Sequence, residues 1–325
     1  MQGKIQEQAL QRIGILVPCF NEESVLPEFY SRMQSVIAQM TRFEFHYIFI
    51  NDGSSDRTLE IMHGFRKENS NVHIVDLSRN FGKEIAMLAG LDYCDYDAVV
   101  IMDADLQDPP ELLPEMVDWW LQGFKDVYAR RRSRAGETWL KKYSSHMFYK
   151  ILQRVTNVPI QVDVGDFRLL DRQCIEALKM FRECQRYTKG MFSWIGFDKK
   201  EILFDRDPRA AGKTKWNYYK LVNLAIEGIT GFTIVPLRFA SLLGFLCAIA
   251  SLCFMMYIVV KTLIFGVDLP GYASMTSIML FIGSMQLLFL GIIGEYLGRV
   301  FNETKHRPIY LVKEYDGKTV INQKK

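Results

Sequence analysis

YDAVVIMDADLQDPP, residues 96–110, decides the fold, because an apolar segment of strand length runs directly into an acidic loop. Asp103 and Asp105 follow that segment two residues apart, and strand geometry directs both side chains to the same face. Two carboxylates this close repel each other unless a cation lies between them. Mg²⁺ and Mn²⁺ combine a few protein carboxylates with diphosphate oxygens. The stretch therefore predicts a metal-dependent site at a strand end. The alternative is a solvated acidic turn.

The pattern of a strand followed by a polar loop repeats on both sides of this stretch. Apolar segments of strand length alternate with segments of helical periodicity. Such alternation predicts an α/β fold with a mostly parallel, Rossmann-like sheet, whose ligands bind beyond the carboxyl ends of the strands. The expected strands are 13–18, 45–50, 72–77, 96–102 and 126–129, and the expected helices are 23–40, 57–68, 83–92 and 110–122.

The loops after the expected strands carry acids, amides and cations. NDGSSD follows the second strand, RNFGK the third, and the arginines of 130–132 the fifth. Because parallel strands end at one edge, these side chains are expected to meet. Neither GxGxxG nor GxxxxGK[ST] occurs, so dinucleotide-binding and P-loop NTPase interpretations lose their main support.

Composition narrows the class of protein further. Lys+Arg number 40 and Asp+Glu 37, a net charge of +3 that gives no reason to expect a nucleic-acid partner. A charged fraction of 24% excludes a multi-span transporter, and 49% hydrophobic residues exclude low-complexity disorder. The six cysteines form no CxxC and no regular spacing, so neither a zinc site nor a disulfide framework is expected.

Two segments near the carboxyl end, 239–260 and 269–294, contain no charged residue and are each long enough to cross a bilayer. Buried helices of a soluble protein seldom run so long without a charge. Basic residues flank this pair of segments, and Lys261 alone lies between them. The positive-inside rule then predicts a multi-pass protein of the cell inner (plasma) membrane with its large amino-terminal part in the cytoplasm.

Two further segments, 140–156 and 216–232, are rich in aromatic and basic residues. This composition suits a helix that lies on an anionic membrane surface. For 140–156 an ordinary core-facing helix is an equal alternative. The expected organisation is a cytoplasmic catalytic domain over 1–215 that includes an interfacial helix at 140–156, a juxtamembrane helix over 216–236, a two-span hairpin over 237–298 and a cytoplasmic tail over 299–325.

Several motifs in fixed order resemble one enzyme family. They are VPCFNEE (17–23), NDGSSD (51–56), RNFGK (79–83), DADLQDPP (103–110), DVGDFRL (163–169) and RAAGKTKW (209–216). This set resembles the inverting family 2 glycosyltransferases of GT-A fold. With the hairpin, it is similar to bacterial polyisoprenyl-phosphate glycosyltransferases, a group related to dolichyl-phosphate mannose synthase and to undecaprenyl-phosphate glucosyl and aminoarabinosyl transferases. The resemblance covers about residues 12–312.

The resemblance implies roles for individual residues. Asp105, Asp166, Arg130 and Lys215 are implied as catalytic, and Asp103, Asp105 and Gln107 as metal and diphosphate ligands. The implied nucleotide contacts are Pro18, Phe20, Glu22, Asp52 and Asp103, with Asp52 accepting from the base or ribose. The implied acceptor-phosphate contacts are Arg130, Arg131, Lys141, Ser145, Arg209 and Lys215. Spacing alone aligns 130–145, so Arg131 or Lys142 could take its neighbour's place.

The implied reaction moves one sugar from a nucleotide diphosphate sugar, with UDP expected, to a polyisoprenyl (undecaprenyl) monophosphate, with Mg²⁺ or Mn²⁺ as cofactor. No QxxRW motif occurs, which favours a single transfer over polymer synthesis. A GDP-mannose-using dolichyl-phosphate mannose synthase analogue and a non-catalytic nucleotide-sugar-binding membrane scaffold are the alternatives. The hairpin also leaves a homo-oligomer open.

Overall fold

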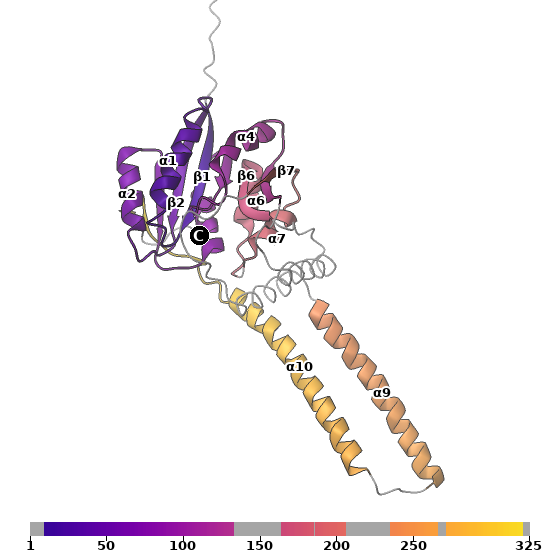
Figure 1. Ribbon diagram of the computed structural model, residues 1–325. Helices are drawn as coiled ribbons and strands as arrows, with labels where there is room; N and C mark the ends of the chain where they lie inside the picture. The colour runs from indigo at the N-terminus through magenta and orange to yellow at the C-terminus, as the bar shows by residue number, and fades with distance from the viewer. Residues whose placement is uncertain (1–9, 133–163, 185, 206–234, 266–270, 321–325) are drawn as a thin grey trace, which may run out of the picture.

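The computed structural model describes residues 10–132, 164–184, 186–205, 235–265 and 271–320 (Figure 1). A sheet covered by helices on both faces forms one part, and a hairpin of two long helices forms the other. The expected segment 140–156 lies outside the described residues, as do residues 216–234 of the expected juxtamembrane helix and Asp163 of the DVGDFRL motif.

The described strands form one nine-stranded sheet in the order β7-β5-β6-β4-β1-β2-β3-β8-β9. Strands β4, β1, β2 and β3 are parallel neighbours, as the alternating pattern predicts. Strand β6 lies antiparallel between β4 and β5, so β5 again runs in the direction of β4. The bounds are β1 Gln11–Cys19, β2 Phe43–Asn51, β3 Val72–Leu77, β4 Ala98–Ile101, β5 Asp126–Arg131, β6 Val164–Asp171, β7 Lys199–Phe204, β8 Val312–Tyr315 and β9 Lys318–Thr319. The predicted α/β class is confirmed.

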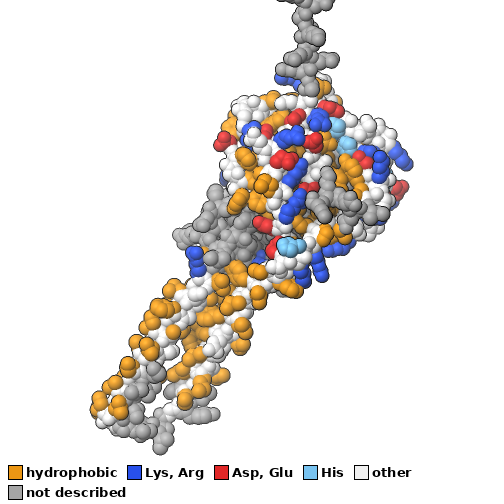
Figure 2. Space-filling model, turned by 180° about the vertical axis from the view of Figure 1, so that it is seen from behind, with side chains coloured by type: hydrophobic (Ala, Val, Ile, Leu, Met, Phe, Trp, Pro, Cys, Tyr) orange, Lys and Arg blue, Asp and Glu red, His pale blue; other side chains and the backbone are white. Residues whose placement is uncertain are grey.

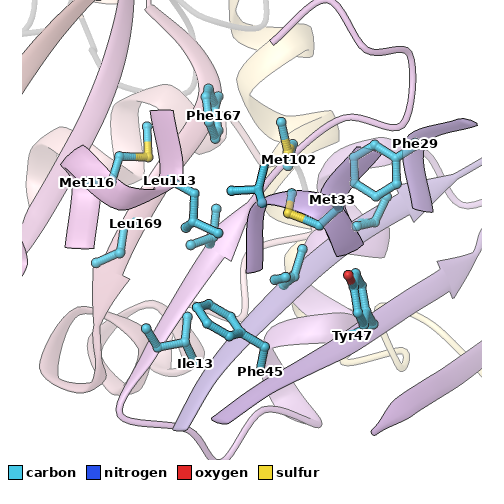
Figure 3. Packing of buried hydrophobic residues seen from close by; sticks show 14 of the residues in the cluster. Ile13, Phe29, Met33, Phe45, Tyr47, Met102, Leu113, Met116, Phe167 and Leu169 are labelled. Atoms are coloured by element: carbon cyan, nitrogen blue, oxygen red, sulfur yellow. The ribbon is translucent and has the colours of Figure 1, made fainter. Parts of the chain in front are cut away.

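Helices bury the two faces of the sheet in separate apolar layers, because alternate strand residues point to opposite faces. Ile13 of β1 packs with Phe29 and Met33 on one face (Figure 3). Leu16 of the same strand packs on the other face with residues such as Met87. The helices are α1 Leu26–Ile37, α2 Thr58–Glu68, α3 Lys83–Asp92, the 3-10 helix η1 Pro110–Leu112, α4 Leu113–Leu121, α6 Arg172–Met180 and α7 Thr188–Trp194.

The hairpin consists of α9, Val235–Phe265, and α10, Tyr272–Thr304. At 1.5 Å per residue each helix is roughly 45–50 Å long, more than the ~30 Å hydrocarbon core of a bilayer. The candidate spans, Leu237–Phe254 and Ile278–Thr304, are 6% and 0% buried. Hydrophobic side chains therefore cover the outside of both helices (Figure 2). A core helix of a soluble protein would be buried, so these exposed helices indicate membrane association.

The described residues contain these two candidate spans and no others. The two helices thus support membrane association, and the multi-pass prediction is not supported beyond them. Helix α10 continues past the predicted end of its apolar segment, through Glu295 to Thr304, and leads the chain back to the sheet.

Residues beyond the hairpin join the sheet, which the sequence pattern did not indicate. Strand β8 pairs antiparallel with β3, and Asp316 accepts a hydrogen bond of 2.8 Å from the Ile74 amide. The amide of Ser78, directly after β3, donates to the Leu311 carbonyl at 2.9 Å. The segment expected as a cytoplasmic tail therefore contains one edge of the sheet.

This connection sets the orientation of the sheet toward the hairpin. Leu311 lies at the carboxyl end of β3, seven residues after α10 ends at Thr304. Strand β1 begins at the end of the sheet far from the hairpin, so its carboxyl end points toward the hairpin (Figure 1). The loops expected to carry the chemistry thus face the membrane-associated helices.

Candidate active site

The loop after β4 holds the Asp-x-Asp pair in a tight turn. Asp105 Oδ1 accepts a hydrogen bond of 3.2 Å from the Gln107 amide. Leu106 between them is 3% exposed and has a φ of 59°. A bulky residue rarely adopts this left-handed conformation, which costs about 1–3 kcal/mol and persists where the surrounding structure enforces it. The loop is therefore held in a fixed shape.

Lys83 joins three elements at this edge. Its Nζ lies 2.6 Å and 2.8 Å from the two carboxylate oxygens of Asp103, after β4, and 2.6 Å from Asp166 Oδ2, on β6. Burial alone would lower the pKa of Lys83, but the carboxylates of Asp103 and Asp166 outweigh it and raise that pKa. Burial would likewise raise the pKa of Asp166, but Lys83 lowers it. Asp166 is therefore ionised at neutral pH and is a weak base.

Asp108 and Arg131 lie beside the triad formed by Lys83, Asp103 and Asp166. Asp108 is 4% exposed, and burial, together with the charge of Asp103, raises its pKa to about 7. The Arg131 guanidinium opposes that rise. Asp108 Oδ1 and Arg131 Nε are both buried and lack a hydrogen-bond partner among the residues that the structure describes. Buried polar atoms are usually paired, so these two mark a place where a ligand can complete the bonding.

Helix α7 brings a second lysine to the same place. The Thr188 amide donates to Glu84 Oε2 at 3.0 Å and so packs α7 against the start of α3. Lys189 follows Thr188. Its burial lowers the pKa of its amine, and the charge of Asp166 opposes that shift. The charge of Glu84 acts on Lys189 in the same direction as that of Asp166. Lys189 is thus a cation positioned beside the acids of the site.

The loop after β2 positions the start of α3. Asp52 is 3% exposed, and its two carboxylate oxygens accept from the amides of Phe81 at 2.7 Å and Gly82 at 2.9 Å. Gly53 has a φ of 66°, and a Cβ there would lie 2.5 Å from backbone atoms of Arg79 and Asn80. Asp52 therefore holds the loop that leads into Lys83, the first residue of α3. Its expected contact with a base or ribose stays a prediction.

The other expected nucleotide contacts lie at the carboxyl ends of β1 and β2. Pro18 pairs in register with Ile50, and Phe20 is 39% exposed. The Glu22 amide donates to Thr58 Oγ1 at 2.9 Å, which ties the β1 loop to the start of α2. These residues border the loop of Asp52, and an exposed phenyl ring suits stacking on a base.

The arginine run divides between two environments. Arg130 Nη1 lies 3.1 Å from Glu201 Oε2 on the edge strand β7. The guanidinium of Arg131 instead lies next to Gly165, beside Asp166 on β6, and its charge lowers the pKa of Asp108. The expectation that Arg130 is the catalytic arginine is thus not supported by its contacts, whereas the alternative residue Arg131 lies in the site. Lys141, Ser145, Arg209 and Lys215 lie outside the described residues.

The site therefore gathers Asp103, Asp105, Gln107 and Asp166 with Arg131, all from the sequence prediction, and adds residues that sequence reasoning missed. Lys83 and Asp108 lay inside quoted motifs without a role, and Glu84 and Lys189 had no recognisable signal. The oxygens of Asp103, Asp105 and Gln107 fit Mg²⁺ or Mn²⁺, which use one or two carboxylates and complete their shell with phosphate oxygens. Among the residues described, no group of three or more His, Cys, Asp or Glu side chains forms an all-protein metal cage.

Comparison with known proteins identifies the chain. Residues 14–179 match the profile of Glycosyl transferase family 2, and residues 235–300 match the GtrB C-terminal hairpin. An uncharacterized glycosyltransferase of Synechocystis sp. PCC 6803 is 47% identical over 305 residues, covering 94% of this chain and 96% of that one. The bactoprenol glucosyl transferase of Shigella phage SfV is 39% identical over 302 residues, covering 93% and 98%.

The fold, the site and these matches define an enzyme, a glycosyltransferase of GT-A fold with a carboxyl-terminal hairpin. Within that class, the chain belongs to glycosyl transferase family 2. The resemblance drawn from its motifs is confirmed.

Proposed function

We propose that the enzyme transfers one sugar, with inversion, from a nucleotide diphosphate sugar to a polyisoprenyl monophosphate at the cytoplasmic face of the membrane. UDP is the expected nucleotide. Similarity to a bactoprenol glucosyl transferase over nearly the whole chain supports the acceptor class. The observation that carries the proposal is that the acid and cation cluster lies at the sheet edge facing the hairpin (Figure 1).

The chemistry follows from the charges at that edge. Asp103, Asp105 and Gln107 would hold Mg²⁺ or Mn²⁺, which supplies Lewis acidity for the departing diphosphate. A phosphate monoester has a second pKa near 6 and is largely dianionic at pH 7. The acceptor therefore needs little help from a base, and the harder task is to hold two anions close together. Arg131 and Lys189 are placed for that task.

Asp166 has a role that fits this scheme. Lys83 lies 2.6 Å from one of its oxygens and lowers its pKa, which makes Asp166 a poor proton acceptor. A fixed, ionised carboxylate instead orients a hydroxyl of the transferred sugar or the neighbouring cations. We assign Asp166 this positioning role.

The hairpin explains how a lipid reaches the site. Exposing a polyisoprenyl tail to water costs about 0.8 kcal/mol per CH₂, so the tail stays in the bilayer and the site must lie at headgroup level. We retain the predicted organisation as part of the proposal, with β8 and β9 added to the catalytic part: a cytoplasmic domain over 1–215 including 140–156, a juxtamembrane helix over 216–236 and a hairpin over 237–298. The short path from Thr304 to Leu311 keeps the sheet near the membrane.

The test is incubation of the full-length protein with undecaprenyl phosphate and a panel of nucleotide sugars, with the lipid product scored by mass. One sugar phosphate lipid is expected, dependent on Mg²⁺ or Mn²⁺. Asp105→Asn should reduce turnover by at least about 10²-fold, whereas Asp205→Asn, at an exposed acid that lies 3.6 Å from Arg132, serves as the matched control.

Each outcome bears on an alternative. Product from GDP-mannose in place of a UDP-sugar would support the mannose synthase analogue. Donor binding without product from any combination of sugar and lipid would contradict the proposal and support the scaffold. Product formation with full activity in the presence of a chelator would remove the metal from the mechanism.

A further inference from the structure

We propose that Lys83 is an internal counter-ion that holds the metal side of the site before the donor arrives. In this proposal, the incoming metal ion displaces the ammonium from Asp103, and Lys83 then pairs with the donor diphosphate. The inference rests on the proposed function and deepens it, because it names a further residue that contacts the donor.

The geometry of the triad supports an exchangeable cation. The Lys83 ammonium contacts both oxygens of Asp103, the first acid of the expected metal set, at 2.6 Å and 2.8 Å. The side chains of Lys83 and Asp103 are 39% and 34% exposed. A metal ion approaching from solvent can therefore reach the carboxylate that the lysine occupies.

The residue type also suits exchange. Lysine carries a compact point charge on a flexible four-carbon stem, whereas arginine binds carboxylates through a rigid fork. The backbone below Lys83 is fixed, because Asp52 binds the amides of Phe81 and Gly82 just before it. A fixed base with a flexible stem allows the ammonium to move between two partners while α3 stays in place.

Each of the two carboxylates that Lys83 leaves would still have a positive charge beside it. Asp103 would gain the metal ion. Asp166, whose side chain is 17% exposed, keeps the favourable charge of the partly buried Lys189, which already acts on it electrostatically. The site thus keeps its balance of charge when the lysine moves, which a triad built only for stability would not need.

The first test measures binding of Mn²⁺ alone to the full-length protein without nucleotide, by electron paramagnetic resonance. Lys83→Gln removes the competing charge and should bind Mn²⁺ about tenfold tighter than the wild type, as expected for one partly screened charge. Lys83→Arg keeps a cation and should remain near the wild type. Lys67→Gln, at an exposed position on α2, is the control. Unchanged or weaker binding by Lys83→Gln would overturn the proposal.

A second test needs no variant and so does not depend on how the variants fold. Amine acetylation of Lys83 in the wild type is followed by peptide mass spectrometry. Mn²⁺ alone should raise its labelling severalfold by releasing the ammonium, and Mn²⁺ with UDP should lower it again. Labelling that ignores Mn²⁺ contradicts the displacement.

These results separate the two proposals. A chain that makes the glycosylated lipid while Lys83 shows neither effect keeps the proposed function and loses this inference. A chain in which Lys83 responds to Mn²⁺ but no lipid product forms keeps this inference and loses the proposed function. A wild type that binds no Mn²⁺ overturns the metal role in both.

Discussion

Asp166 and Arg168 are two residues apart on β6 and point to the same face of the sheet, yet their surroundings differ in kind. Arg168 is 1% exposed, donates to Asp126 at 3.0 Å and lies 3.6 Å from the centre of the Phe192 ring. Asp166 joins a cluster whose Lys83 and Asp103 remain about one-third exposed. One pair is sealed inside the protein, and the other is open at the edge where ligands bind.

The difference shows how to separate structural from functional charges. Asp126, the partner of Arg168, is 0% exposed, so a ligand has no access to that pair. In the open cluster, the side chains of Lys83 and Asp103 are 39% and 34% exposed, so a ligand can reach them from solvent. Mutations in the sealed pair should therefore change stability, and mutations in the open cluster should change activity.

The largest effect should follow removal of the Asp166 charge. Asp166→Asn keeps the shape but loses the ion pair with Lys83, so turnover should fall by at least about 10²-fold through misplacement of the reacting groups. The melting temperature should stay within about 2–4 °C of the wild type, because the cluster is partly solvated. Turnover is measured as lipid product formation, and the melting temperature is measured by thermal unfolding. A variant that melts early and turns over normally would erase the distinction.

Opening the sealed pair should give the opposite result. Asp126→Ala strands the buried guanidinium of Arg168, which typically costs about 3–5 kcal/mol of unfolding free energy. Asp205→Ala removes an exposed partner of Arg132 and should cost less than about 1 kcal/mol. Denaturant unfolding of both variants in detergent compares them. Equal stability would show that the Asp126 pair contributes nothing beyond a surface pair.

The two neighbouring arginines sharpen the comparison within one strand. Arg131→Gln should raise the KM for the acceptor lipid about tenfold, because a charge-assisted contact to phosphate is lost. Arg130→Gln should change that KM less than about threefold, since Arg130 contacts Glu201 on the edge strand. Initial rates measured at varied acceptor concentration give the KM of each variant. The reverse order of effects would place Arg130 in the site instead.

The smallest effect concerns pH. Burial raises the pKa of Glu84 to about 7, although hydrogen bonding from Thr188 opposes it. The folded state then retains a proton that the unfolded state loses near pH 4.5, so this group's contribution makes stability fall as pH rises from about 4.5 to about 7. Glu84→Gln should remove that component, flattening the melting temperature between pH 5 and 7 by about 2–4 °C. An identical pH profile in both proteins would exclude Glu84 as its source.

Sequence reasoning located the acids of the site and missed their partner. Asp103 and Asp105 were evident because an apolar strand leads straight into them. Lys83 lay in a quoted motif, but its two partners are distant in the chain. Asp103 is 20 positions away and Asp166 is 83 positions away. The sequence also did not distinguish Arg130 from Arg131, because the partner of Arg130, Glu201 on β7, lies 71 positions away in the chain.

The sequence by itself determined the alternating α/β elements, the Asp-x-Asp strand end and the two apolar spans, because each depends on the period or length of a continuous segment. Only the tertiary structure decided that Lys83 pairs with Asp166, and that β8 returns from the hairpin to the edge of β3. These contacts join distant segments, and their energies depend on distance and burial in space, which a linear pattern does not contain.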